Sequence, residues 1–165
     1  MNNGKTPGLL TLKGVQIKRL PFKVEKLGDF LWYESPLFSH LFTEQNEDFL
    51  IKWCSQDADF NRWLLYKTNY NLLFDYFNGK IGDLELVLKN PDGFAFIVDI
   101  DHDIEWRRVF LIAVEDIPEA YLPESSARYD VETFEPYAEK LHAYLDFHFA
   151  RQQKRPEPAV RLAVA

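Results

Sequence analysis

The chain has 165 residues, 47% of them hydrophobic, which suits one domain with a core that needs no disulfide or metal. A formal net charge of −7 argues against nucleic acid as the main partner, and no apolar run approaches the ~20 residues of a membrane span. The single cysteine, Cys54, excludes an internal disulfide and a thiolate metal cluster, and the first residues lack the apolar core of a signal peptide. We therefore expect a cytoplasmic protein.

The charge is unevenly distributed along the chain. Residues 151–165 have a net charge of +3, which leaves −10 on residues 1–150. Glycine and proline in residues 1–14 predict a flexible arm, and two prolines make residues 153–165 a basic tail that cannot continue a helix. The part between them, 15–152, is predicted to be a single domain.

The first half of the chain has the pattern of antiparallel strands. Alternation predicts an edge strand at Val15–Leu20, and further strands are expected at Asp29–Tyr33 and Leu37–Thr43, with a turn ending at Pro36. The central prediction is a pair of strands, Phe49–Cys54 and Asn61–Tyr66, each with a tryptophan near its middle. Paired antiparallel, these two strands form the centre of the predicted sheet.

The second half mixes helices and strands. Apolar residues at positions 70, 73, 74 and 77 predict a short helix near 70–79, ended by Gly79, while Asp83–Lys89 fits a short helix and a strand equally well. Strands are expected at Phe94–Ile100 and Trp106–Val114. A four-turn apolar stripe from Glu132 to about Gln152 predicts a long C-terminal helix. The predicted fold is therefore α+β: a mostly antiparallel, twisted sheet of five to seven strands with both helices packed on it.

One group of residues suggests a metal site. Along a strand, Asp99, Asp101 and Asp103 point to the same side and present three carboxylates to Mg²⁺, as a metal-assisted hydrolase or nuclease requires. A calcium loop starting at Asp99 fails, because its sixth position is Ile104 rather than glycine. The competing interpretation is a solvated hairpin loop, in which aspartates serve turn geometry.

Other catalytic templates do not fit. The four histidines have no paired metal-ligand spacing, and no nucleophile motif surrounds Ser35, Ser39, Ser55 or Cys54. The seven glycines form neither a dinucleotide nor a P-loop motif, so no cofactor is expected.

Candidate binding residues lie in and beside the central strands. Arg62 and Trp63 are predicted to contact a partner, with Arg62 pointing outward next to an acidic loop that contains Asp57 and Asp59. The alternative is an exposed cross-strand ion pair worth only about 0.2–1 kcal/mol.

Several short segments together resemble an uncharacterised family of small bacterial cytosolic proteins. The likeness covers roughly residues 25–125 and consists of turn prolines, glycines and core tryptophans. The segments are Pro36-Leu37-Phe38, Trp53, Asn61-Arg62-Trp63-Leu64, Leu73 to Gly79-Lys80-Ile81, Pro91-Asp92-Gly93 and Tyr121-Leu122-Pro123. The resemblance implies no catalytic residue.

The acidic, aromatic-rich composition favours a non-enzymatic protein-binding module, such as an immunity-type inhibitor or an accessory subunit of a toxin or phage-defence system. Its partner would be a protein with a basic surface, and the metal-assisted enzyme is the alternative. A third hypothesis is that the tail, 151–165, contacts nucleic acid or an acidic patch of a partner.

Overall fold

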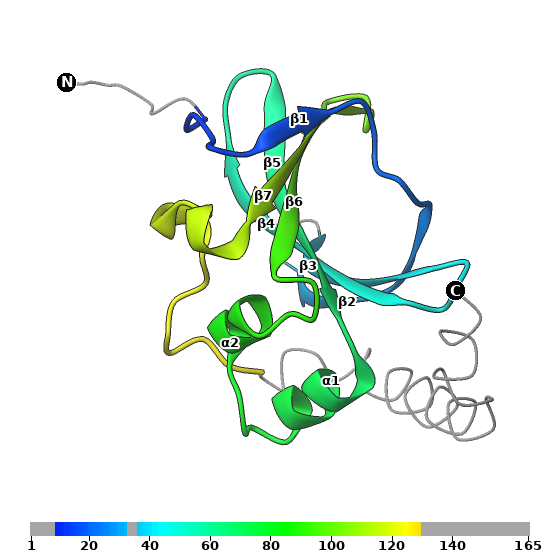
Figure 1. Cartoon of the computed structure of the whole chain (residues 1–165), viewed down its shortest axis with the longest axis vertical. Helices are drawn as coiled ribbons and strands as arrows, with labels where there is room; N and C mark the ends of the chain where they lie inside the picture. The colour runs from blue at the N-terminus through cyan, green and yellow to red at the C-terminus, as the bar shows by residue number, and fades with distance from the viewer. Residues whose placement is uncertain (1–8, 33–35, 130–165) are drawn as a thin grey trace, which may run out of the picture.

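The computed structural model describes residues 9–32 and 36–129, which form a seven-stranded antiparallel sheet with two short helices (Figure 1). The strands are β1 (Val15–Ile17), β2 (Val24–Trp32), β3 (Pro36–Thr43), β4 (Asp48–Gln56), β5 (Phe60–Thr68), β6 (Phe94–Asp101) and β7 (Trp106–Ala113). The α-helices are α1 (Tyr70–Phe77) and α2 (Asp83–Leu88), and two short 3-10 helices follow β7, η1 (Val114–Asp116) and η2 (Glu119–Tyr121). The described part thus confirms the sheet-dominated α+β prediction.

Strands β2 to β7 pair in chain order, and β1 then pairs with β7 at the far edge. The first two strands therefore occupy opposite edges of the sheet, and the β1–β2 linker has to pass along one face to connect them. Figure 1 shows this linker beside the sheet. At the centre, Trp53 of β4 lies opposite Trp63 of β5, as the sequence predicts.

Both faces of the sheet carry apolar side chains, and both faces are at least partly covered by other segments. On one face, Leu50, Leu64, Tyr66 and Ile97 form a core with the helices, and all four are almost fully buried. On the other face, a second cluster contains Leu41, Phe49, Ile51, Leu65, Phe96, Val98 and Val109. The linker supplies part of the cover there, since the ring of Phe22 stacks on Phe49 with centroids 4.6 Å apart.

The structure confirms the predicted helix at α1 and decides between the two alternatives at α2. The side chain of Asn69 accepts a hydrogen bond from the Leu72 N–H (2.9 Å) and caps α1, and Gly79 follows the helix with a φ of 75°. The 83–89 segment is helical rather than extended, because helical spacing buries Leu86 and Val87 together.

Several predicted boundaries are wrong. The first strand is confined to Val15–Ile17, the second begins at Val24 rather than Asp29, and Pro36 opens β3 instead of closing a turn. The β2–β3 register shifts between Lys26 and Gly28 and twice more further along, and such irregularities disrupt the alternation from which strand limits are predicted. A proline is tolerated at the first position of a strand.

The predicted helix at 132–152, the tail at 153–165 and most of the arm at 1–14 lie outside the described residues. Within the described part, no helix is long and apolar enough to cross a membrane.

Cys54 is expected to react slowly with thiol reagents. Burial raises the pKa of its thiol to about 12, and the thiol donates to the carbonyls of Lys52 and Tyr121. At pH 8 the thiol is therefore almost entirely protonated, and the thiolate is the nucleophile. Labelling with Ellman's reagent should be slow in buffer and fast in denaturant, whereas equal rates would show that the thiol is accessible.

Candidate functional site

Two hairpin loops lie side by side at the upper end of the sheet in Figure 1: the β4–β5 loop and the β6–β7 loop. They are adjacent because Phe60 of β5 pairs with Asp101 of β6. His102 Nε2 also lies 2.8 Å from the carbonyl oxygen of Ala58. We call residues 57–59 and 101–106 the acidic tip. Its carboxylates are Asp57, Asp59, Asp101, Asp103 and Glu105, it contains no lysine or arginine, and its net charge is −5.

Two of these carboxylates shape the loops. Asp57 accepts hydrogen bonds from the N–H groups of Asp59 and Phe60, both at 2.8 Å. Burial tends to raise the pKa of Asp57, but these backbone hydrogen bonds outweigh it and lower the pKa. Asp101 accepts from the N–H groups of Asp103 and Glu105. Its pKa is lowered first by the Arg107 guanidinium and then by the Glu105 N–H.

The remaining side chains of the tip are presented to solvent. Asp59, Asp103 and Glu105 are exposed, and Ile104, which lies between Asp103 and Glu105 in the sequence, is 74% exposed. Ile104 has a φ of 63°, a left-handed conformation that a β-branched residue rarely adopts and that costs about 1–3 kcal/mol. Trp106, the last residue of the tip, is 37% exposed and is the second partly exposed apolar side chain there. An open depression of about 400 Å³ lies between the loops, lined by Asp59, Phe60, Asp101, His102, Asp103 and Arg107.

Directly below the tip, charged residues of three strands form a network. Arg62 of β5 lies opposite Asp99 of β6, and Asp99 lies opposite Arg108 of β7. The Arg62 Nε and Nη2 atoms donate to both oxygens of Asp99 at 2.7 and 2.8 Å, and Arg108 Nε donates to Oδ2 at 2.9 Å. The Arg108 guanidinium also lies 4.4 Å from the centre of the Phe60 ring. This network fixes β5, β6 and β7 where the two loops begin.

The prediction that Arg62 points outward is wrong. Its side chain is 3% exposed, and Asp99 is fully buried beside it. Nη1 of Arg62 donates to the carbonyl of Leu10 (2.7 Å) and to the Tyr121 hydroxyl (3.1 Å). Burial tends to lower the pKa of Arg62, but the hydrogen bonds to Asp99 and Tyr121 raise it above its usual value. Arg62 thus joins the sheet to two distant segments of the chain.

The other predicted site residues divide between the tip and the sheet. Asp57, Asp59, Asp101 and Asp103 all belong to the acidic tip, although the sequence assigned them to two separate candidate sites. Trp63 lies on the opposite face of the sheet from Arg62, half-buried against the second apolar cluster.

The three aspartates of the proposed metal site do not converge. Asp99 lies inside the sheet with arginines on both oxygens, while the oxygens of Asp101 are used by loop N–H groups and Arg107. In the part of the chain that the structure describes, no three His, Cys, Asp or Glu side chains are grouped to hold a metal ion.

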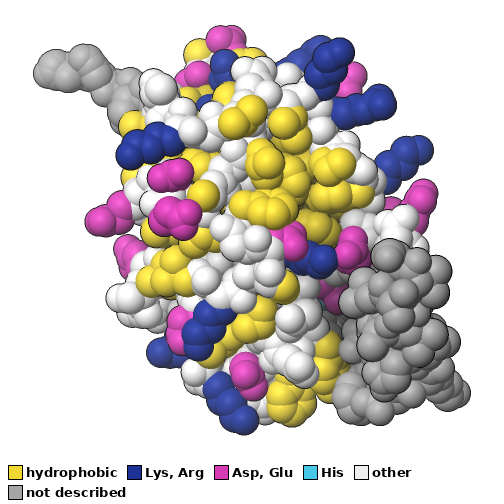
Figure 2. All heavy atoms as spheres, in the orientation of Figure 1, with side chains coloured by type: hydrophobic (Ala, Val, Ile, Leu, Met, Phe, Trp, Pro, Cys, Tyr) yellow, Lys and Arg dark blue, Asp and Glu magenta, His cyan; other side chains and the backbone are white. Residues whose placement is uncertain are grey.

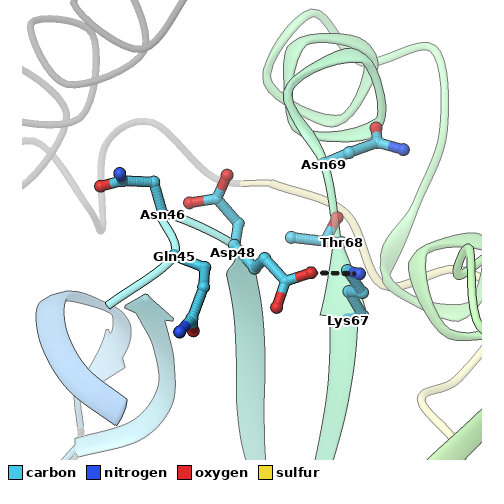
Figure 3. A pocket seen from close by; sticks show the side chains of 7 residues that line it. Gln45, Asn46, Asp48, Lys67, Thr68 and Asn69 are labelled. Atoms are coloured by element: carbon cyan, nitrogen blue, oxygen red, sulfur yellow. Dashed lines mark hydrogen bonds and ion pairs between the residues drawn. The ribbon is translucent and has the colours of Figure 1, made fainter. Parts of the chain in front are cut away.

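A second, polar hollow of about 290 Å³ lies where the β3–β4 loop meets the end of β5 (Figure 3). Lys67 donates to Glu47 across it at 2.8 Å, and Asp48 and Thr68 line its base. Asp48 also accepts a 2.9 Å hydrogen bond from the fully buried His40. Sequence reasoning missed the His40–Asp48 pair. Its signal was the position of His40, two residues after the core residue Phe38 on the same side of a strand.

Comparison of the chain with protein-family models, with curated proteins and with solved structures gave no match. The resemblance to an uncharacterised bacterial family therefore stays a prediction.

Proposed function

We propose that the protein is a non-enzymatic binding module that holds a basic surface of a partner protein on its acidic tip. The observation that supports this most directly is Ile104, an exposed isoleucine kept in an unfavourable backbone conformation between Asp103 and Glu105 in the sequence. Such strain is retained where the surrounding structure enforces it, and it concentrates at functional sites.

The tip combines the two components of a protein–protein contact. Ile104 and Trp106 offer apolar area that can be fully desolvated at the centre of an interface. The carboxylates around them attract Lys and Arg and speed the encounter with a basic protein. Because the pKa values of Asp57 and Asp101 are lowered, both stay charged at a pH below the usual range for aspartate.

The network beneath the tip supports the same role, because it holds the loops rigidly before a partner arrives. Pre-formed sites lose less conformational entropy on binding. We infer that the partner is a basic toxin, such as a nuclease, or a basic subunit of a phage-defence complex in the cytoplasm. The protein would then act as its immunity-type inhibitor or accessory subunit. The lone cysteine and the acidic body support this setting.

Binding is tested with a partner captured from the source cells and identified as a basic protein. We expect Ile104→Ser to weaken its affinity about tenfold or more, as loss of a central apolar anchor does. Asp103→Asn/Glu105→Gln should slow association and reduce its salt dependence.

The matched control is Glu115→Gln/Glu119→Gln, which removes the same charge from exposed positions outside the tip. If the carboxylates acted only by long-range electrostatic attraction, the tip double variant and the control double variant would weaken binding by the same amount. If neither tip variant weakens binding more than the control does, the tip is not the binding site.

A further inference from the structure

A second charged surface has the opposite sign. Residues 13–26, which we call the basic strap, comprise β1, the linker and the start of β2. The strap has five basic side chains (Lys13, Lys18, Arg19, Lys23 and Lys26) and one acid (Glu25), a net charge of +4, whereas residues 1–150 as a whole carry −10.

The strap cations are turned to solvent. Lys13, Lys18, Arg19 and Lys23 are exposed, and none forms an ion pair with a described residue. Figure 2 shows Lys and Arg side chains along the margin where the linker runs. Cations that form no ion pair with the described residues increase the attraction of this margin for an anionic surface.

The strap also borders apolar surface. Half-buried Ile17, Leu20 and Phe22 pack on the second apolar cluster of the sheet, and Figure 2 shows a group of hydrophobic side chains between the sheet and this margin. An open hollow of about 480 Å³ lies at the linker, lined by Arg19, Leu20, Pro21, Phe22, Lys23, Glu44 and Gln45. The strap thus places Leu20, Pro21 and Phe22 between the cations Arg19 and Lys23, in a hollow whose lining is mixed polar and apolar.

We propose that the basic strap binds the acidic tip of a second copy of this chain. The tip combines the exposed Ile104 and Trp106 with carboxylates, and the strap combines Leu20, Pro21 and Phe22 with cations, so the two surfaces are opposite in charge and both carry apolar residues. Each copy has one of each, so the contact builds either a reciprocal pair or a longer series. A basic partner of the tip would compete with it.

The chemistry favours a protein surface over nucleic acid as the occupant. Single-stranded nucleic acid binds by stacking bases on free aromatic faces as well as by phosphate contacts. The one aromatic ring of the strap, Phe22, is already stacked on Phe49 and lies edge-on to Phe96.

Self-association is measured by sedimentation equilibrium of the purified chain, without any other protein. We expect the average mass to rise with protein concentration at about 0.05 M NaCl and to fall toward the monomer at about 0.5 M, where charges are screened. The strap variant Lys18→Glu/Arg19→Glu/Lys23→Glu and the tip variant Asp59→Lys/Asp103→Lys/Glu105→Lys should each lower the association constant at least about tenfold.

Mixing the two charge-reversed variants gives the decisive result, because the reversed tip of one then faces the reversed strap of the other. Restored association of the mixture supports the contact. The proposal is overturned if the wild type is monomeric at every concentration. It is also overturned if the strap variant associates as strongly as the wild type does. Aggregation of the strap variant, without aggregation of the tip variant, also overturns the proposal. The strap lysines would then serve only to keep exposed sheet edges from pairing with another chain.

This inference does not require the proposed foreign partner, although it uses the same tip. The strap variant should lose self-association and keep its affinity for a basic partner, while Ile104→Ser should weaken both. The two proposals can therefore fail separately.

Discussion

Asp99→Asn is expected to lower the free energy of unfolding by about 3–5 kcal/mol, the usual cost of breaking a buried ion pair from one side. Both oxygens of Asp99 accept from the buried Arg62, and one also accepts from Arg108. With the negative charge removed, the Arg62 guanidinium stays 3% exposed without its counter-ion. Urea denaturation followed by tryptophan fluorescence measures the loss.

Two further variants separate this cost from a general effect of losing a carboxylate. Asp101→Asn removes a charge whose ion-pair partner, Arg107, is exposed, so it should change stability far less. Arg62→Met/Asp99→Leu removes both charges and should recover much of the loss, because an apolar pair needs no counter-ion. If Asp99→Asn costs no more than Asp101→Asn, the network does not stabilise the sheet.

The burial of Arg62 could be predicted in part from the sequence. Residues 62, 64 and 66 share one side of a predicted strand, and Leu64 and Tyr66 on that side are plainly core residues. Alternation therefore places Arg62 on the buried side, where an arginine needs a carboxylate. Which carboxylate it meets could not be predicted. The pairing with Asp99 depends on the β5–β6 register, and a shift of one residue would turn Asp99 to the other face.

The tip shows the same division between local and long-range information. Turn chemistry in the two aspartate-rich loops is local, and the sequence indicated both loops correctly. Their union into one surface follows only from the pairing of Phe60 with Asp101. The exposure of Ile104 was also hidden, because its left-handed backbone contradicts the preference of isoleucine.

Tyr66 and Tyr76 offer a matched pair of substitutions in the core on the helix face. Both are almost fully buried, and burial is the main cause that raises the pKa of each hydroxyl. Their surroundings differ in one respect. Tyr76 Oη donates to Asp83 Oδ1 at 2.8 Å, whereas Tyr66 Oη has no hydrogen-bond partner among the described residues.

Removing the two hydroxyls should therefore have opposite effects. Tyr76→Phe leaves the carboxylate of Asp83, itself 7% exposed, without this donor and should destabilise by about 1–3 kcal/mol. Tyr66→Phe removes a buried polar atom that makes no hydrogen bond and should stabilise by about 1 kcal/mol. Urea denaturation of both variants at neutral pH gives the comparison. The dependence of the unfolding free energy on urea concentration should match that of the wild type, because the surface exposed on unfolding hardly changes. A loss in Tyr66→Phe as large as that in Tyr76→Phe would mean that the Tyr66 hydroxyl is hydrogen-bonded in solution.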